Sequence, residues 1–501
     1  MNIKTIFLLS YIIVLPELFL GVCIVYLVFH SLFLGFNRCN NFILIEKPIL
    51  FLIKLTILFV CLLLINQNFL GLRILGFSNT FVFDILTNTS KIIIGITSII
   101  FFFIIEHFVS TPKINYFEYY IIFLFAFLGT FLICTSNDLL IAYLSIELQG
   151  LSFYLLASFN KNSSYSVEGG LKYFILGSFS SGLFLYGSSI LYGLFGTLNF
   201  TDFSELSEDS LGNNIFSPDI FQYPLFLILI SLLFKLAIAP FHVWLSDIYE
   251  GSPFSSTFFF AVVPKLSIFI LFLKVFNYCF LNVFFYLTDV LVIIAVVSII
   301  VGSFGGLEQR KLKSLLAYSS ISHMGYILIV FSLPNTEGFQ LAFSYLIIYM
   351  LSGLCFWFIL MLIMVKTVYL KKQNKDLTDL ILLHKSNSGL AINLNIILFS
   401  IAGFPPLIGF LTKIGLFLAA VEVHYYFISF LSVFCSVIST FYYIRVIKIL
   451  YFEISVLVGK LYYPIKNQIT FLLVLLVYFL IFFFIRPNLL FFISYKISFV
   501  L

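Results

Sequence analysis

Lys235 lies in the middle of an apolar segment, 223–244, and Pro240 follows five residues later in the string FKLAIAPFHVW. Proline has no N–H, so it cannot donate to the carbonyl of Leu236, one turn earlier. Inside a membrane that carbonyl needs another donor, such as water or a protonated amine. A titratable group beside an interrupted membrane helix therefore indicates a site that binds protons or cations.

The same pattern occurs a second time. Pro405 and Pro406 interrupt the apolar segment 390–420, and Lys413 follows within GFPPLIGFLTKIGLF. An amine about two helical turns beyond a Pro-Pro break is costly to bury, so we interpret Lys413 as a group that carries protons. Two interrupted helices of this kind are typical of transporters built from two related halves.

Glu147 and Lys265 also lie deep within apolar segments. Glu147 is in the middle of NDLLIAYLSIELQGLSFYLLASF, and Lys265 follows Pro264 far from either end of the segment 254–281. A charged side chain at the centre of a membrane helix costs about 2.5 to 3.5 kcal/mol, so such residues normally line a hydrated interior. The structural alternative for Glu147 is an acid bonded to Ser or Tyr hydroxyls, and we favour the functional interpretation.

Lys172, Lys313 and His323 are weaker candidates for the same chemistry. Lys172 in GGLKYFILGSFSSG and Lys313 in EQRKLKSLLAYSSISHMGY begin their apolar segments, where a lysine either anchors at the membrane surface or relays protons. His323 has an unperturbed pKa of about 6.5, which suits proton exchange. A lone histidine is more often a satisfied polar group, so both interpretations stay open for all three residues.

Five other charged residues in apolar segments receive no functional role. Lys54 and Lys274 lie near the ends of their segments, so we expect their amines to extend to the membrane surface. Glu17, Glu106 and Asp289 are left unassigned.

The composition indicates a membrane protein. Of the 501 residues, 62% are hydrophobic and 10% are charged, and the mean hydropathy is +1.14, far from the values of soluble domains. A helix needs about 17 to 25 apolar residues to cross the hydrocarbon core, and we predict an all-α protein with fourteen such spans. The spans are 5–30, 49–65, 91–109, 117–136, 139–159, 170–196, 222–245, 254–281, 284–304, 311–332, 339–366, 390–420, 424–448 and 467–487.

Lysine and arginine are distributed unevenly between the predicted loops. Sixteen of the 27 lie in the loops after odd-numbered spans, five lie in the other loops and the termini, and six lie within spans. Positive charge concentrates on the cytoplasmic or matrix face, so both termini are expected on the opposite face. The sixteen are Arg38, Lys47, Lys113, Lys161, Arg310, Lys311, Lys313, Lys366, Lys371, Lys372, Lys375, Lys385, Arg445, Lys448, Lys460 and Lys466, and the five are Lys4, Arg73, Lys91, Arg486 and Lys496.

Several classes of function are disfavoured because their motifs are missing. The sequence has no G-x-G-x-x-G after a strand and no G-x-x-x-x-G-K-[ST], so we expect no bound nicotinamide nucleotide or ATP. Its seven cysteines include no CxxC pair and its six histidines are scattered, so we expect no metal, haem or iron–sulfur cofactor in this chain. The net charge of +5 follows from the loops and does not indicate nucleic-acid binding.

Five strings between Asn137 and Arg445 resemble the antiporter-like membrane subunits of proton-pumping NADH:quinone oxidoreductase, respiratory complex I. In order, they are DLLIAYLSIELQGLSFYLLASF, GGLKYFILGSFSSGLFLYG, FKLAIAPFHVWLSDIYEGSP, LKSLLAYSSISHMGY and GFPPLIGFLTKIGLF. Each string alone is weak, but five in this order are specific. Lys413, where some sister subunits have a glutamate, favours the subunit 2 branch. Gly150 departs from the serine expected after ELQ, which affects a local hydrogen bond rather than Glu147.

The resemblance implies a fold of fourteen helices with two inverted five-helix repeats, at 117–281 and 284–448, each containing one broken helix. Segment 1–116 would hold the first three helices, and 449–501 a loop and the last helix, all in a single membrane domain. By the same resemblance, Glu147 would pair with Lys235 beside the first break. Lys265 would be the central relay and Lys413 the exit-side amine, with further relay candidates at Lys172, Lys313 and His323.

The implied activity is proton translocation coupled to electron transfer from NADH to ubiquinone. FMN, iron–sulfur clusters and ubiquinone would lie in other subunits. The partners would be other membrane-arm subunits, especially neighbouring antiporter-like and small membrane subunits, together with lipids. The 67 Phe and 29 Tyr residues suit an A+T-rich organellar genome, so we expect the mitochondrial inner membrane, with both termini toward the intermembrane space.

Two other classes of protein share these features. A sodium/proton antiporter also has broken helices and buried lysines, and its flux would depend on sodium. A structural scaffold would keep the architecture without the activity, so that Lys235→Ala would leave pumping intact.

The charge distribution gives a test of topology. A tag at the N-terminus should be inaccessible to a membrane-impermeant reagent confined to the matrix-like face. The basic loops stay on that face and so place the N-terminus on the opposite one. Labelling of the tag from that face would contradict the fourteen-span topology.

Overall fold

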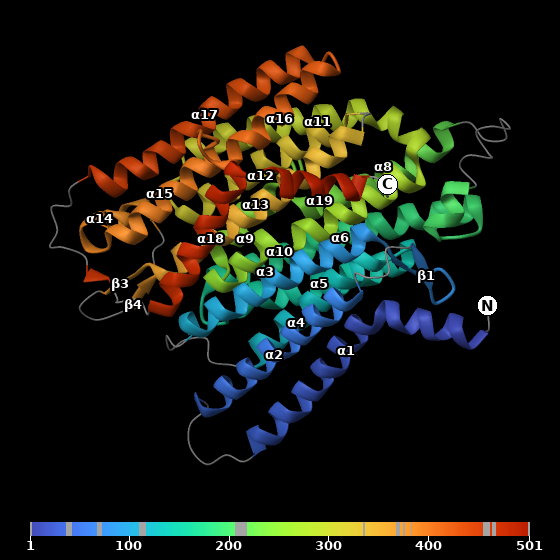
Figure 1. Ribbon diagram of the computed structural model, residues 1–501, viewed down its shortest axis with the longest axis horizontal. Coiled ribbons are helices and arrows are strands. Elements are labelled where there is room, and N and C mark those ends of the chain that lie inside the picture. Colours follow the sequence, from blue (N-terminus) through green and yellow to red (C-terminus); the bar gives the residue numbers. More distant parts are fainter. Residues whose placement is uncertain are drawn as a thin grey trace. The chain divides into compact units, whose positions relative to one another are not determined.

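The computed structural model describes residues 3–36, 43–67, 73–109, 117–205, 218–333, 336–366, 371–373, 376–381, 383–453, 461–462 and 467–498. Among these, eleven helices are long and apolar enough to cross a membrane, or twelve if the bent pair α18–α19, with an 82° bend, forms one span. The predicted α-helical membrane fold is confirmed (Figure 1), and the described residues add two small sheets to it. The count of fourteen is not confirmed, because two of the predicted spans are broken into shorter helices.

The chain divides into two compact units. Unit 1 is formed by residues 1–236 and 251–287, and unit 2 by residues 237–250 and 288–499. The division into repeats and segments that the sequence suggests stays a prediction, as does the inverted relation of the repeats.

Unit 1 is built around one enclosed helix. Its elements are α1 (Ile3–Phe36), α2 (Ile43–Gln67), β1 (Ile74–Gly76), β2 (Phe81–Phe83), α3 (Ile85–Val109), α4 (Phe117–Thr135), α5 (Leu139–Ser158), α6 (Ser164–Phe195), α8 (Pro218–Leu236), α10 (Phe254–Leu273) and a π-helix (Lys274–Cys279). Strands β1 and β2 pair antiparallel, with Ile74 opposite Phe83. Helix α10 packs against α3, α4, α5 and α8, and every one of its residues is buried.

Unit 2 has its own enclosed helix. Its elements are α9 (Val243–Gly251), α11 (Leu281–Leu307, which begins in unit 1), α12 (Leu312–Phe331), α13 (Thr336–Leu362), β3 (Met364–Lys366), β4 (Lys371–Gln373), a 3-10 helix (Leu377–Leu380), α14 (Leu383–Ser386), α15 (Ser388–Ala402), α16 (Ile408–Glu422), α17 (Tyr426–Tyr451), β5 (Leu461–Tyr462), α18 (Asn467–Ile485) and α19 (Asn488–Ser498). Strand β3 pairs antiparallel with β4 and β5. Helix α12 packs against α13 and α16 and is almost wholly buried.

Both predicted breaks are present. Helix α8 ends at Leu236, Ala237 has a φ of +58°, and α9 begins at Val243. Helix α15 ends at Ala402, Gly403 has a φ of +86°, and α16 begins at Ile408. Left-handed backbone cannot continue an α-helix, so each predicted repeat contains a broken helix, as expected.

The start of α3 corrects one prediction. The helix begins at Ile85 rather than at 91, and Thr87 caps its start: the Thr87 hydroxyl accepts a hydrogen bond from the Asp84 N–H at 2.9 Å, the reciprocal half of a capping box. Lys91 therefore does not belong in a loop, where the charge count placed it. Of the other basic loop residues, Arg38, Lys113, Lys375, Lys460 and Lys466 lie outside the described residues.

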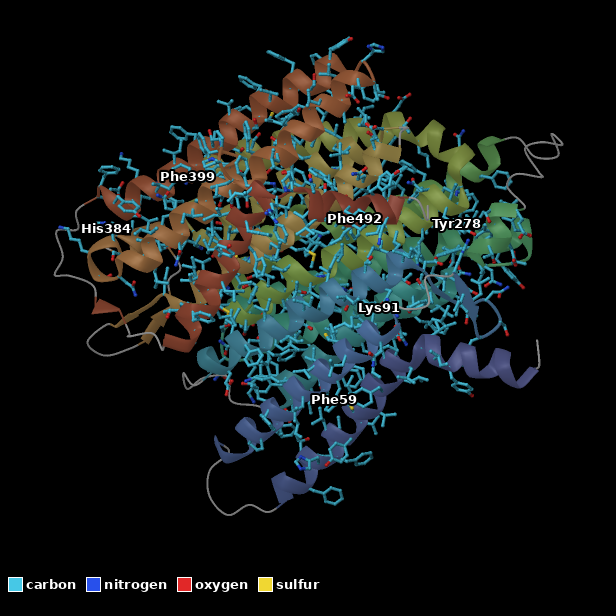
Figure 2. The ribbon with its side chains drawn as sticks, in the orientation of Figure 1. Phe59, Lys91, Tyr278, His384, Phe399 and Phe492 are labelled. Atoms are coloured by element: carbon cyan, nitrogen blue, oxygen red, sulfur yellow. The ribbon has the colours of Figure 1, made fainter. Side chains whose placement is uncertain are left out.

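Lys91 instead forms a buried ion pair with Glu17, one of the acids left unassigned. Lys91 on α3 is fully buried and its amine meets the Glu17 carboxylate on α1, and Figure 2 labels Lys91 in its helix. Of the other two acids, Glu106 pairs with Lys54 between α3 and α2, and Asp289 is exposed on α11. Of these two ion pairs, Glu17–Lys91 is the one in which both side chains lack access to solvent.

We expect Glu17→Gln or Lys91→Met to destabilise the protein by about 3 to 5 kcal/mol, because each leaves one buried charge without its partner. The double variant Glu17→Leu with Lys91→Met should recover most of that loss, since no charge is then stranded. Thermal unfolding in detergent and the amount of protein in membranes measure both effects. A double variant as unstable as the single ones would contradict a simple ion-pair role.

Candidate functional site

Lys235 and Glu147 belong to one polar cluster in unit 1. Lys235 lies in the last turn of α8 and is half-buried, and its amine is 3.4 Å from the hydroxyl of Tyr154 on α5. Glu147 lies on α5 two turns before Tyr154, on the same face of the helix. The Glu147 carboxylate also acts electrostatically on Lys235. The structure thus places the predicted partners of the first break within one another's electric field.

Two glycines make room for this cluster. A Cβ atom at Gly177 on α6 would lie 2.1 Å from the Tyr154 hydroxyl, so a side chain there would push the tyrosine away from Lys235. A Cβ atom at Gly150 would lie 3.2 Å from that hydroxyl and 3.7 Å from the Lys235 amine. The serine expected at position 150 would have faced this amine, and here the tyrosine hydroxyl faces it instead.

Lys265 lies in the interior of α10 and is only 4% exposed. The other residues of α10 are buried as well, and most of them are apolar. The burial agrees with the depth expected from the sequence. Its role as central relay stays a prediction.

Lys413 forms a hydrogen bond with the backbone at the second helix break. Its amine donates to the carbonyl of Ala402, the last residue of α15, at 2.7 Å. This carbonyl is four residues before Pro406, which cannot donate to it. The aliphatic part of Lys413 lies against Gly403, where a Cβ atom would come within 2.8 Å, and the amine is 5.7 Å from the ring centre of Tyr326. An amine here satisfies the acceptor that the break frees.

Lys413 and His323 line the same small cavity in unit 2. Its volume is about 20 Å³, enough for about one water molecule. The His323 ring on α12 is buried and bonds through Nδ1 to the Tyr345 hydroxyl at 2.8 Å, and its Nε2 is 3.5 Å from the Tyr443 hydroxyl. The cavity is also lined by Tyr345, Ile348, Tyr349, Ser352, Ser400, Ile401, Gly409 and Thr412. Imidazole, phenols and amine are therefore placed around a site that can hold water.

The two remaining lysine candidates differ in burial. Lys313, the second residue of α12, is 6% exposed, which favours an interior position over an anchor at the surface. Lys172 lies two turns inside α6, with 43% of its side chain exposed, and pairs with Glu168 at 2.8 Å on the same helix face. Its surroundings suit a surface anchor better than a relay, and its role stays a prediction.

Sequence reasoning missed several residues of these clusters. Tyr154, Tyr345 and Tyr443 hold the titratable groups, yet 29 tyrosines are spread over the chain and no local spacing distinguishes these three. Lys274 was expected to reach the membrane surface and is buried instead, 6% exposed. That prediction was wrong, because the lysine donates to backbone carbonyls of its own unit.

These arrangements suit the movement of protons. A buried amine binds and releases a proton without covalent chemistry, and hydroxyl, imidazole and water pass it over short distances. The hydrogen bond of Lys235 goes to a tyrosine hydroxyl and that of Lys413 to a backbone carbonyl. Both oxygens are neutral, so neither of these bonds holds the proton on the amine as a carboxylate would. Each cluster can therefore exchange a proton with hydrated neighbours.

Comparison with known proteins points to one family. The family described as NADH:quinone oxidoreductase/Mrp antiporter, TM, matches residues 136–439. The chain is similar to NADH-quinone oxidoreductase subunit N of Pelagibacter ubique (strain HTCC1062), with 35% identity over 88% of this chain and 89% of that protein. It is 40% identical to NADH-ubiquinone oxidoreductase chain 2 of Marchantia polymorpha, over 77% of each.

A solved structure shares the fold. A chain of respiratory complex I from Thermus thermophilus superposes with a TM-score of 0.76 at 23% identity, covering 95% of this chain and 98% of that one. At this identity the likeness establishes the architecture alone. Together with the sequence matches, it confirms the resemblance inferred from the five strings.

Proposed function

Because this chain belongs to the NADH:quinone oxidoreductase/Mrp antiporter transmembrane family, we propose that it is a proton-translocating membrane subunit of an NADH:quinone oxidoreductase. The supporting observation is that relatives named subunit N or chain 2 are 35% and 40% identical over most of their length. The subunit 2 branch favoured by Lys413 is the branch that these names describe. The chain acts within an enzyme that oxidises NADH and reduces a quinone.

The redox chemistry belongs to other subunits in this proposal. The sequence has no nucleotide-binding motif and no cysteine pair suited to a cluster, so FMN, iron–sulfur clusters and ubiquinone are assigned elsewhere in the complex. The partners are other membrane-arm subunits and lipids. We assign the protein to the mitochondrial inner membrane, with its termini toward the intermembrane space, because a plant chain 2 is among its relatives and the basic loops favour that orientation.

The proton path starts at the first broken helix. Glu147 on α5 and Lys235 on α8 act on each other through their charges, and quinone reduction elsewhere moves charge near them. When the carboxylate is neutralised or drawn away, the field that retains the proton on Lys235 weakens. The proton then passes to Lys265 and on to Lys413, with Lys313 and His323 as intermediate positions. The lysine burial and the cavity beside Lys413 support this sequence of carriers.

A sodium/proton antiporter is the alternative function, because the matching family includes Mrp antiporters. The relatives named above favour the oxidoreductase. The two functions differ in ion dependence: sodium-driven proton flux by the chain without NADH would support the antiporter. Flux that requires NADH oxidation would support the oxidoreductase subunit.

Glu147→Gln tests the charge pair. The amide keeps the shape of the side chain but removes its charge, and loss of a proton-transfer group slows transfer by about 10² to 10⁴-fold. We expect the complex to assemble and to transfer electrons in uncoupled membranes, while the protons pumped per electron fall sharply. The matched control is Glu118→Gln, an exposed acid in the first turn of α4, which should pump normally. An unchanged pumping ratio in Glu147→Gln would refute the assignment.

Lys413 distinguishes a proton carrier from a fixed charge. Lys413→Met removes both the charge and the donor to the Ala402 carbonyl and should abolish pumping. Lys413→Arg keeps both, but arginine, with a pKa above about 12, does not release its proton. The arginine variant should therefore assemble yet pump poorly. Proton flux equal to that of the wild type in Lys413→Arg would leave the lysine only a structural role.

A further inference from the structure

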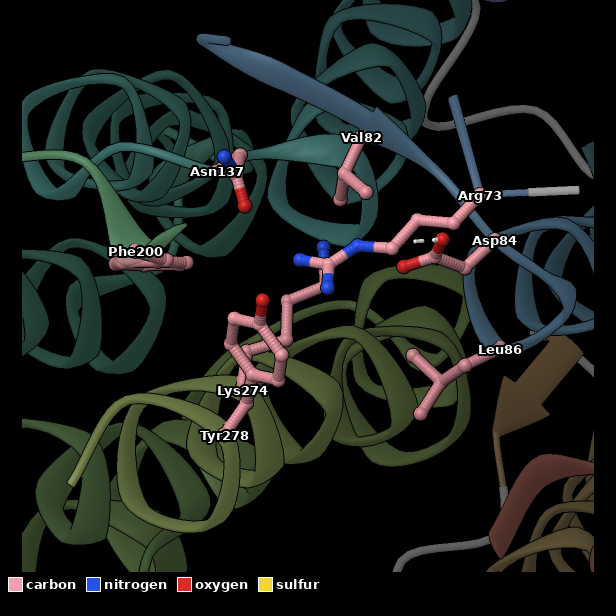
Figure 3. Close-up of a pocket in the computed structure, with 8 residues that line it drawn as sticks. All are labelled: Arg73, Val82, Asp84, Leu86, Asn137, Phe200, Lys274 and Tyr278. Carbon is pink, nitrogen blue, oxygen red and sulfur yellow. Dashed lines mark ion pairs between the residues drawn. The ribbon is translucent and has the colours of Figure 1, made fainter. Parts of the chain in front are cut away.

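A second group of charged residues gathers at one end of unit 1. Arg73, Asp84 and Lys274 line a cavity of about 20 Å³, together with Val82, Leu86, Asn137, Phe200 and Tyr278. Figure 3 shows the Arg73 side chain reaching in beside Asp84, with Val82 on one side and Tyr278 on the other. The volume accommodates about one water molecule. Nothing in the proposed proton path uses these residues.

Lys274 forms the inner wall of this cavity. Its amine donates to the carbonyls of Cys134 at 2.5 Å and Ser136 at 3.0 Å. These oxygens belong to the last turn of α4 and the residue after it, where helix carbonyls have no partner within the helix. An ammonium group has three hydrogens, so a third remains to be given to the cavity. Lys274 therefore connects the end of α4 with a site for water.

Asp84 forms the opposite wall and is not satisfied by its neighbours. Its Oδ1 is buried and accepts no hydrogen bond from any described residue, and the nearest cation, Arg73 Nε, is 3.7 Å away. That distance is too long for a direct hydrogen bond and suits a bridging water. Arg73 is held in place by the Tyr278 ring, 4.3 Å from the guanidinium carbon. A carboxylate oxygen without a donor beside an enclosed space indicates that water occupies the space.

Other polar groups near Lys274 suggest hydration as well. Asn277 lies in the same π-helix as Lys274, and its side-chain oxygen and nitrogen are both buried without a partner among the residues described.

Burial raises the pKa of Asp84 above its usual value, although Lys274 and Arg73 oppose that change. Asp84 precedes α3, so it lies outside the membrane-spanning helix. It is an acid that water can reach from the cavity and that accepts protons more readily than a free aspartate.

We propose that Arg73, Asp84 and Lys274 form a hydrated proton port that joins the membrane surface beside β1 and β2 to helix α10. Asp84 takes a proton from surface water or returns one to it, and the cavity water passes it to or from Lys274. Arg73, with 37% of its side chain exposed, holds the outer end of the port open to solvent. No bond other than those to the moving proton forms or breaks.

Lys274 connects the port to helix α10. It follows α10 directly and lies nine residues after Lys265, which corresponds to about 13 Å along the helix at 1.5 Å per residue. The helix changes from α to π at Lys274, and such local changes are frequent at functional sites. This inference rests on the proposed function, since a port is useful only to a chain that moves protons.

Two variants in the assembled complex test the port. Asp84→Asn keeps the size of the side chain but cannot exchange a proton, and Lys274→Arg keeps the charge and the bonds to the end of α4 but resists deprotonation. Both should reduce protons pumped per electron by about tenfold or more while NADH:quinone electron transfer in uncoupled vesicles is retained. Glu118→Gln, at the opposite end of α4, is the control. Normal pumping in either variant would overturn the port.

A labelling experiment covers the case in which a variant fails to assemble. In a chain whose native cysteines are replaced, Arg73→Cys, at the exposed outer end of the port, should react with a charged, membrane-impermeant maleimide added to one face of sealed vesicles. Absence of reaction from both faces would overturn the port, because its outer end would then lack contact with bulk water.

The outcome separates the port from the proposed function. If Lys413→Arg loses pumping while Asp84→Asn pumps normally, the chain is a proton translocator and the port is wrong. If neither variant changes pumping, the proposed function itself fails.

Discussion

Backbone carbonyls released at helix ends inside a membrane must find a donor, and much of this structure follows from that requirement. Hydrocarbon offers no water to bond with them, and each unsatisfied group costs several kcal/mol. Lys413 donates to the carbonyl that ends α15, and Lys274 to two carbonyls at the end of α4. Lys235 likewise lies in the last turn of its helix. The negative end of a helix dipole favours an ammonium group at each place.

This requirement links proton binding to backbone geometry. A protonated lysine completes the helix end, and a neutral one has one donor fewer to give and no charge for the dipole to attract. The helix end beside it must then relax or recruit water. The conformation of the backbone at a helix break therefore depends on whether the neighbouring amine holds its proton.

Much of the fold and part of the site could be predicted from the sequence, for identifiable reasons. Hydropathy locates membrane helices because their length is set by the bilayer, and proline locates breaks because it removes a donor. Hydropathy does not report which way a helix faces or where a polar cap starts it. Lys91 was therefore placed in a loop, although its helix starts at the cap formed by Asp84 and Thr87, about two turns earlier. Lys274 was assigned to the surface because its partners, the carbonyls of α4, are far away in the sequence. The tyrosines that hold Lys235 and His323 come from other helices, which no periodicity in one segment reveals.

Three hydroxyl groups around the cavity beside Lys413 give it a direction. Ser352, Ser400 and Thr412 each donate their single hydrogen to a carbonyl of their own helix, at 3.1, 2.7 and 2.9 Å. Such a hydroxyl can only accept from anything in the cavity. A water molecule there turns its hydrogens toward these oxygens and its lone pairs toward the Lys413 amine. The cavity thus holds its solvent in the orientation that receives a proton from the lysine, and a proton moving the opposite way must first turn that water around.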